Sequence, residues 1–187
     1  MGKLRLLLSA AVLLLVSYAA DAQKFTISTN LLDYACLGTM NVEGSYALSR
    51  RWSLSAGARY NPFTFRASDP LRQFQMRQLS CSAGVRIWPW HTSSGWWFAG
   101  KARYQVYNYG GIASRATREG DRVGAGVYAG YTHMLGPHFN LEFGLGAWAG
   151  VDWYDIYSCQ VCGLTVDSGN GLFVLPDDIM VAVVYVF

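Results

Sequence analysis

Residues 179–187 read IMVAVVYVF, and this segment alternates between two sets of side chains. The larger or more lipid-compatible set, Ile179, Val181, Val183, Tyr185 and Phe187, falls on one face of an extended chain. A period of two is typical of a β-strand, whereas an α-helix repeats every 3.6 residues. We therefore expect a final strand that presents one apolar face.

The same alternation recurs back along the chain, and no stretch of ten or more residues after Gln23 has helical periodicity. Between Phe139 and Val151, for example, apolar positions alternate with polar residues and glycines. Eight strands are expected on this criterion, at residues 24–32, 40–48, 52–60, 74–88, 96–108, 122–135, 139–152 and 179–187.

The segments between the expected strands alternate in length. Residues 49–51, 89–95 and 136–138 form short connections, while residues 61–73, 109–121 and 154–177 form long ones; only the link 33–39 is short for its side. Bacterial outer-membrane barrels have short periplasmic turns and longer outer loops. The sequence therefore predicts an all-β fold, an eight-stranded antiparallel transmembrane β-barrel.

Charge and polarity support lipid on the outside of this barrel. Charged residues are 14% of the chain, against about 25% in a typical soluble domain. A soluble lipocalin-like barrel is the alternative, but here the polar face is the expected interior, the inverse of a soluble core. The charges assigned to the interior have both signs and can pair there: Glu43, Arg59, Arg86, Lys101, Arg103, Arg122, Glu142 and Asp152.

Aromatic residues gather near both ends of the expected strands, as rings do at the boundaries of a bilayer. One set is expected at the periplasmic boundary: Tyr46, Trp52, Trp88, Trp90, Trp96, Phe139 and Phe187. The other set is expected at the outer boundary: Tyr34, Tyr60, Phe74, Tyr107, Tyr109, Trp153 and Tyr154.

The first 22 residues have the three parts of a secretory signal peptide. Two positive charges precede an apolar run from Leu6 to Val16, and small residues stand at the cleavage positions Ala20 and Ala22. That run is shorter than the roughly 20 residues that a membrane-spanning helix needs. We expect a signal peptide over residues 1–22 and an outer-membrane β-barrel over residues 23–187.

These features resemble the small OmpA/OmpX-like outer-membrane barrels. The resemblance implies that the terminal segment, with Tyr185 and Phe187, is the signal that the outer-membrane assembly machinery recognises. More narrowly, residues 28–33 (STNLLD), 41–43 (NVE) and 51–54 (RWSL) resemble an uncharacterised barrel family, a domain of unknown function common in Bacteroides-type bacteria. The resemblance covers most of the mature chain.

An enzyme is the less favoured interpretation. Enzymes of this barrel class, as the resemblance implies, place a His beside Ser, Asp or Glu near the outer rim. Here His91 and His138 fall in turns on the expected periplasmic side, and His133 lies late in a strand running toward it. Asp152, Asp155 and Ser158 are therefore expected at the outer rim without a partner base.

The four cysteines favour a disulfide between surface loops, because an exported protein meets an oxidising environment. A bridge from Cys36 to Cys159 or Cys162 competes with a strained local bridge inside the Cys159–Cys162 CxxC motif. Cys81 is interpreted as a small apolar residue on the lipid face. We expect no metal and no cofactor, because a lone CxxC lacks two further ligands; a zinc or redox role for the motif is the less favoured alternative.

Two functional hypotheses follow. The first is a non-enzymatic outer-membrane barrel whose loops meet envelope or surface protein partners, in addition to outer-membrane lipid and the assembly machinery. The second is a rim enzyme or small-solute channel that uses Asp152, Asp155 and the interior charges. The net charge of +3, without a basic run, does not point to nucleic acid.

Overall fold

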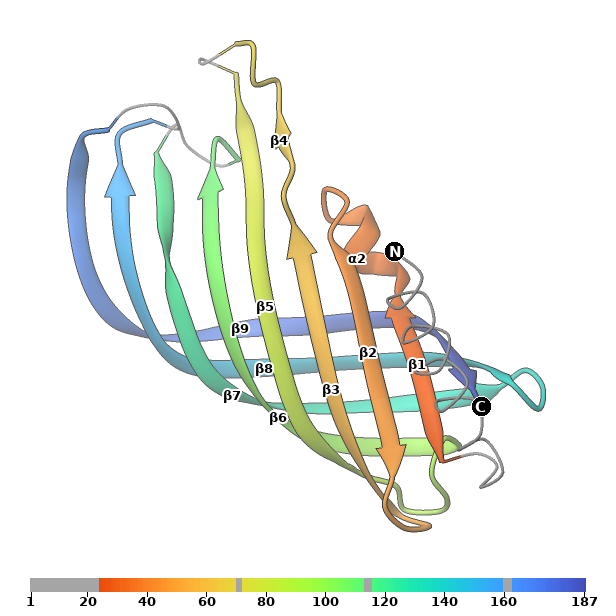
Figure 1. Ribbon diagram of the computed structural model, residues 1–187. Helices are drawn as coiled ribbons and strands as arrows, with labels where there is room; N and C mark the ends of the chain where they lie inside the picture. Colours follow the sequence, from red (N-terminus) through yellow and green to blue (C-terminus); the bar gives the residue numbers. More distant parts are fainter. Residues whose placement is uncertain (1–23, 70–71, 113–115, 160–162) are drawn as a thin grey trace, which may run out of the picture.

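A computed structural model of the chain describes residues 24–69, 72–112, 116–159 and 163–187. The fold is a closed, eight-stranded antiparallel β-barrel with almost no helix, as expected from the sequence (Figure 1). The elements in chain order are β1 (Phe25–Asn30), α2 (Leu31–Ala35), β2 (Met40–Ala47), β3 (Trp52–Asn61), β4 (Thr64–Phe65), β5 (Phe74–Ile87), β6 (Gly95–Gly110), β7 (Thr117–Met134), β8 (Phe139–Tyr157) and β9 (Thr165–Val186). Within the described residues, no helix is long and apolar enough to cross a membrane.

Two pairings close the barrel. β3 pairs with β5 from Trp52↔Ile87 to Asn61↔Gln78, and β1 pairs with β9 from Thr26↔Val186 to Asn30↔Ala182. The two-residue strand β4 is not a ninth barrel strand, because it only adds a short pairing to the end of β5. Closure gives every barrel strand two neighbours, at least over part of its length.

Apolar and polar residues that alternate along each strand face opposite sides of the barrel wall. Outward side chains are apolar and exposed, such as Val127 at 73% and Leu145 at 68%. Inward side chains include buried charged residues, such as Lys101 at 4% and Glu142 at 3%. The barrel is therefore apolar outside and polar inside, the reverse of a soluble domain.

A small aromatic core fills the interior near the turn end, which we define as the end carrying residues 48–51, 88–94 and 135–138. Its buried members are Trp88, Trp97, Ala99, Tyr128, Met180 and Ala182. The Trp88 indole Nε1 donates to Ser53 Oγ at 3.0 Å. Trp88, 2% exposed, therefore faces inward, and its expected place in the boundary belt was wrong. Tyr107, 1% exposed, is likewise an interior residue.

The short helix α2 directly follows β1. It lies at the end of β1 opposite the turn end, and we call this opposite end of the barrel the loop end. Asn30 terminates β1 and caps α2, with its Oδ1 accepting from the backbone N–H of Leu32 at 3.2 Å. The same side chain continues the pairing to β9, since Oδ1 also accepts from Val181 N at 3.0 Å. α2 thus begins where the β1 ladder stops.

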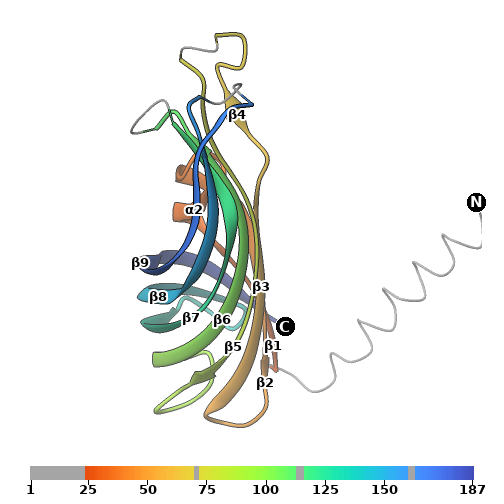
Figure 2. The same ribbon diagram turned by 90° about the vertical axis from the view of Figure 1, so that its left-hand side faces the viewer.

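Several strands extend far beyond this point. β5 to β9 rise above β1, β2 and α2, with β4 close to the highest point (Figures 1 and 2). We call this the projecting part: β4, its connection to β5, and the segments of β5–β9 beyond the last β3–β5 and β1–β9 pairs. In it, β9 pairs with β8 alone, from Met180 back to Thr165.

Because these strands are longer than the sequence predicted, the connections between them are shorter than predicted. The prediction of a connection over residues 154–177 was wrong, because β8 continues to Tyr157 and β9 begins at Thr165. Likewise β7 begins at Thr117, inside the expected connection 109–121. A β-bulge in β9 lies opposite Gly144–Gly146, where the partners change from Met180 to Asp177. One extra residue reverses which side chains face inward, and this places Asp177 in the interior.

Candidate functional site

The interior charges form three clusters along the barrel axis, and these are the candidate site. The lower cluster, nearest the turn end, comprises Glu43, Arg86, Lys101 and Glu142. The middle cluster comprises Asp33, Arg59, Arg103, Tyr128 and Asp177. The upper cluster comprises Tyr107, Arg118, Arg122 and Asp152.

The lower cluster is centred on Arg86, which is 3% exposed. Its guanidinium contacts Glu43 and lies 2.9 Å, Nη1 to Oε2, from Glu142. Lys101 Nζ lies 2.6 Å from Glu43 Oε2, and Thr132 Oγ1 donates to Glu142 Oε1 at 3.0 Å. Each of these four described charges therefore has a partner of opposite sign in a closed interior, where an unpaired charge would be costly.

The middle cluster joins the barrel wall to α2. Arg59 lies between two carboxylates, with Nε 2.8 Å from Asp33 Oδ2 and Nη1 3.2 Å from Asp177 Oδ1. Arg103 contacts Asp177 as well, and the Tyr128 hydroxyl donates to Asp177 Oδ2 at 3.1 Å. The cluster ties β3, β6, β7 and β9 together and holds α2 by Asp33.

The upper cluster is centred on Asp152, which is 3% exposed. Its Oδ1 accepts from the Tyr107 hydroxyl at 2.8 Å, and its Oδ2 lies 2.8 Å from Arg118 Nη2 and 3.4 Å from Arg122 Nε. The Arg122 guanidinium stacks 3.9 Å from the ring centroid of Tyr107. Both oxygens of Asp152 are therefore engaged, so the carboxylate is held rather than presented to a ligand.

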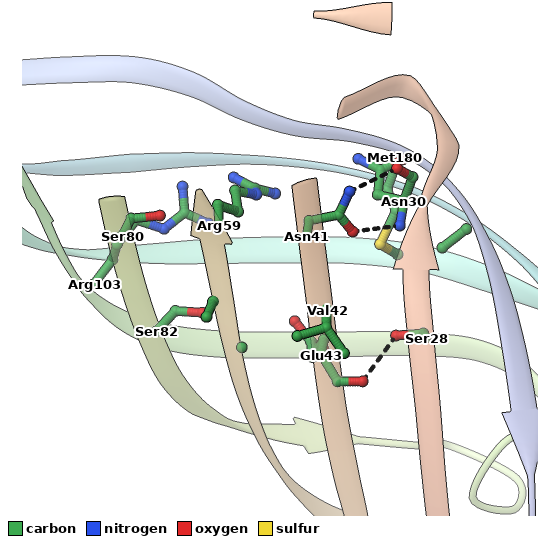
Figure 3. Close-up of a pocket in the computed structure, with 13 residues that line it drawn as sticks. Ser28, Asn30, Asn41, Val42, Glu43, Arg59, Ser80, Ser82, Arg103 and Met180 are labelled. Carbon is green, nitrogen blue, oxygen red and sulfur yellow. Dashed lines mark hydrogen bonds between the residues drawn. The ribbon is translucent and has the colours of Figure 1, made fainter. Parts of the chain in front are cut away.

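A small polar cavity of about 30 Å³ lies against the lower and middle clusters (Figure 3). The Asn30 and Asn41 pair forms one wall, with Asn41 Nδ2 donating to Asn30 O at 2.8 Å. Its other polar lining residues are Ser28, Glu43, Arg59, Ser80, Ser82 and Arg103. A polar space of this size suits ordered water rather than a substrate.

The structure places all of the charges assigned inward from the sequence in these three clusters. Sequence reasoning missed Asp33, Arg118 and Asp177. Asp33 was placed in a connection, and Asp177 was placed at the end of an expected loop. One feature of the sequence could have identified Asp177 as an inward residue. It follows Phe173 and Leu175 at alternate positions, and the β-bulge that reverses which side chains face inward comes after it.

The histidines lie where the sequence placed them, in or beside the turn end. His91 Nδ1 is 3.0 Å from Thr92 O, and His138 Nδ1 is 3.0 Å from Val186 O. His133 is exposed near the end of β7. Asp155, in contrast, is exposed near the loop end of β8. The structure does not bring these histidines and the loop-end carboxylates together.

The cysteine prediction is corrected in one respect. Cys36 is a free, exposed thiol, so the bridge from Cys36 to the CxxC motif was wrong. Cys36 directly follows α2, whereas Tyr157 at the end of β8 and Thr165 at the start of β9 belong to the projecting part. The alternative bridge inside the motif involves residues 160–162, outside the described residues, and stays a prediction. Cys81 is exposed on the outward face of β5, as expected.

The C-terminal aromatic residues form a row on the outer face of the barrel. The rings of Tyr185 and Phe187 lie 5.0 Å apart between centroids. Phe187 also packs 5.4 Å from Phe25 on β1, and Tyr185 packs 5.2 Å from Phe139 on β8. The row therefore crosses the seam between the first and last strands at the turn end.

Comparison with known proteins identifies the family. Residues 8–187 match the family model described as "Protein of unknown function (DUF3575)". The chain belongs to this family. No curated protein and no solved structure matches it. A DUF3575 chain thus forms a closed eight-stranded barrel with three interior ion-pair clusters.

Proposed function

We propose that this DUF3575 protein is an integral outer-membrane β-barrel. The observation that carries the proposal is the inverted polarity of the wall: in the closed part, Ile87 is 42% exposed outside, while the adjacent Arg86 is 3% exposed inside. Burying apolar surface stabilises a protein by roughly 25 cal/mol per Å², so a wall of exposed apolar side chains is favourable only against another apolar medium. In the closed part every barrel strand has two neighbours, so this part leaves no unpaired strand edge in hydrocarbon.

The family resemblance to OmpA/OmpX-like barrels supports the same location. Under this proposal, residues 1–22 direct export, and these residues lie outside the described ones. Tyr185 and Phe187 then form the signal for the assembly machinery, on the exposed seam where the last strand meets the first. The turn end faces the periplasm and the loop end faces outward.

We infer that the role is non-enzymatic and that the interior clusters are structural. Each carboxylate of the lower cluster contacts at least one cation, and Asp152 is engaged by Tyr107 and two arginines. The projecting part then meets envelope or surface partners outside the membrane. Under this proposal the exposed functional element is the sheet of the projecting part, whereas the sequence predicted long loops in that role.

The test of location is extraction and gel mobility. The protein, isolated from outer-membrane fractions, is run on a gel with and without boiling. We expect it to resist extraction by salt and to shift in mobility on heating, because a closed barrel stays compact in detergent until heated. Recovery from the soluble periplasmic fraction, with no heat-dependent shift, would contradict the proposal.

A separate measurement addresses the alternative channel. The folded barrel is inserted into planar bilayers, and conductance is compared with that of the Glu43→Gln/Glu142→Gln variant. We expect no steady conductance from either, because Trp88, Trp97 and the lower cluster fill the turn end. A conductance that the variant changes would favour the channel.

A further inference from the structure

The turn end carries a groove formed by two neighbouring turns. It is lined by Ser49, Arg50, Arg51, Trp52 and Trp90. Ser49, Arg50 and Arg51 come from the connection between β2 and β3, Trp52 begins β3, and Trp90 comes from the connection between β5 and β6. This groove takes no part in the ion-pair clusters of the interior.

Backbone hydrogen bonds hold the two turns together. Trp88 N donates to Arg51 O at 2.8 Å, and Thr92 N donates to Arg50 O at 2.9 Å. Within the first turn, Leu48 N donates to Trp52 O at 2.9 Å. The backbone beneath the groove is thus fixed, and the arginine side chains extend from a rigid base.

The groove is basic and has no acidic neighbour in the turns. Arg50 and Arg51 are both exposed, and neither forms an ion pair with a described residue. The turn end, residues 48–51, 88–94 and 135–138, contains no Asp or Glu, but it does contain His91 and His138. At the loop end, by contrast, Arg72 has Asp69 beside it.

Two exposed tryptophans border the arginines. Trp90 is 72% exposed and Trp52 is 47% exposed. Indole rings favour the boundary between headgroups and hydrocarbon, and guanidinium groups bind phosphate with two parallel hydrogen bonds. Trp52 also begins the apolar outer face of β3, which continues through Leu54. The groove therefore joins a pair of exposed arginines to the apolar outer wall.

We propose that this groove binds the headgroup of an anionic phospholipid in the periplasmic leaflet, with Arg50 and Arg51 on the phosphate and Trp52 and Trp90 beside the glycerol region. The inference rests on the proposed membrane location. It adds one specific lipid-binding site, which would be absent from a barrel whose surface contacts all membrane lipids alike.

The experiment is native mass spectrometry of the folded barrel in detergent at low salt, titrated with phosphatidylglycerol or phosphatidylcholine. The wild-type protein should retain phosphatidylglycerol preferentially. Arg50→Gln/Arg51→Gln should weaken that binding roughly 10- to 30-fold, as expected for two basic residues near an anionic surface. High salt should weaken it too, because the groove is exposed.

The matched control is Arg66→Gln/Arg72→Gln, which removes two exposed arginines at the loop end. It should keep the wild-type preference. Equal retention of the two lipids by the wild-type protein, or an equal loss in the control, would overturn the proposal. So would displacement of the lipid by inorganic phosphate at the same concentration, which would assign the groove to a soluble anion.

Each sample is first checked for the heat-dependent band shift. A variant that keeps this shift is folded, so a missing lipid preference then counts against the groove alone. Failure of the membrane location appears separately, in the fractionation of the wild-type protein.

Discussion

The closed part of the barrel and the projecting part use the same strands under different constraints. In the closed part each strand has two neighbours, and the lower cluster and the Trp88–Trp97 core fill the interior. In the projecting part β9 pairs with β8 alone, and Leu172 is 89% exposed. From this comparison we infer that ring closure, rather than strand length, decides where the stability of this molecule resides, and the following predictions test that inference.

The largest expected effect comes from removing the cation of the lower cluster. Among the described residues, Arg86→Met leaves the buried Glu142 with the Thr132 hydroxyl as its partner, and it removes one of the two cations on Glu43. We expect a loss of about 3–5 kcal/mol in the free energy of unfolding, because a buried charge is left uncompensated. Urea unfolding of the protein in detergent micelles measures it.

The matched variant is Arg86→Met/Glu142→Gln, which removes the orphaned charge as well. It should recover part of the loss, since the remaining Glu43 keeps Lys101. If the double variant is less stable than Arg86→Met, the lower cluster is not the source of the stability.

An intermediate effect is expected from a glycine in the closed part. A Cβ on Gly130 would lie 2.4 Å from both Phe143 O and the Trp97 ring, whereas one on Gly171 in the projecting part meets nothing within 4 Å. Gly130→Ala should therefore cost about 1–3 kcal/mol by overpacking, and Gly171→Ala should cost much less. The same urea transitions compare the two; equal losses would mean that both parts are equally well packed.

The smallest effect is expected in the connection between β4 and β5. Arg72 Nε lies 3.9 Å from Asp69 Oδ2, and both side chains are largely exposed. Arg72→Ala should change the free energy of unfolding by roughly 0–1 kcal/mol, because solvent screens an exposed pair. A loss as large as that of Arg86→Met would show that the projecting part carries as much stability as the closed part.

The strand boundaries show where sequence reasoning succeeded and where it failed. The strands of the closed part were predicted because their apolar and polar positions alternate without interruption, as in Trp52–Tyr60. The first half of β9 was missed because Asp167, Gly169, Asn170, Gly171 and Pro176 are typical of loops. Pairing with β8 overrides these local preferences, since the backbone groups on the edge of β9 that faces β8 gain partners there.

The ion pairs also include one feature that the sequence predicted and one that it did not. The sequence predicted that charges such as Glu43 and Arg86 face inward, because the side-chain period of a strand is two. It did not predict that Arg86 lies between Glu43 and Glu142, 43 and 56 residues away. Such partners depend on the register of strands that are distant in the sequence.

The sequence by itself determined the all-β class, the number of barrel strands and the inversion of polarity, because these follow from a local period of two and from composition. Only the tertiary structure decided the projecting part, the phase change at the β9 bulge, and the choice of Asp33 and Asp177 as partners of Arg59. The physical reason is that strand length and register are set by hydrogen bonds between strands, and a single extra residue reverses the face of every side chain beyond it.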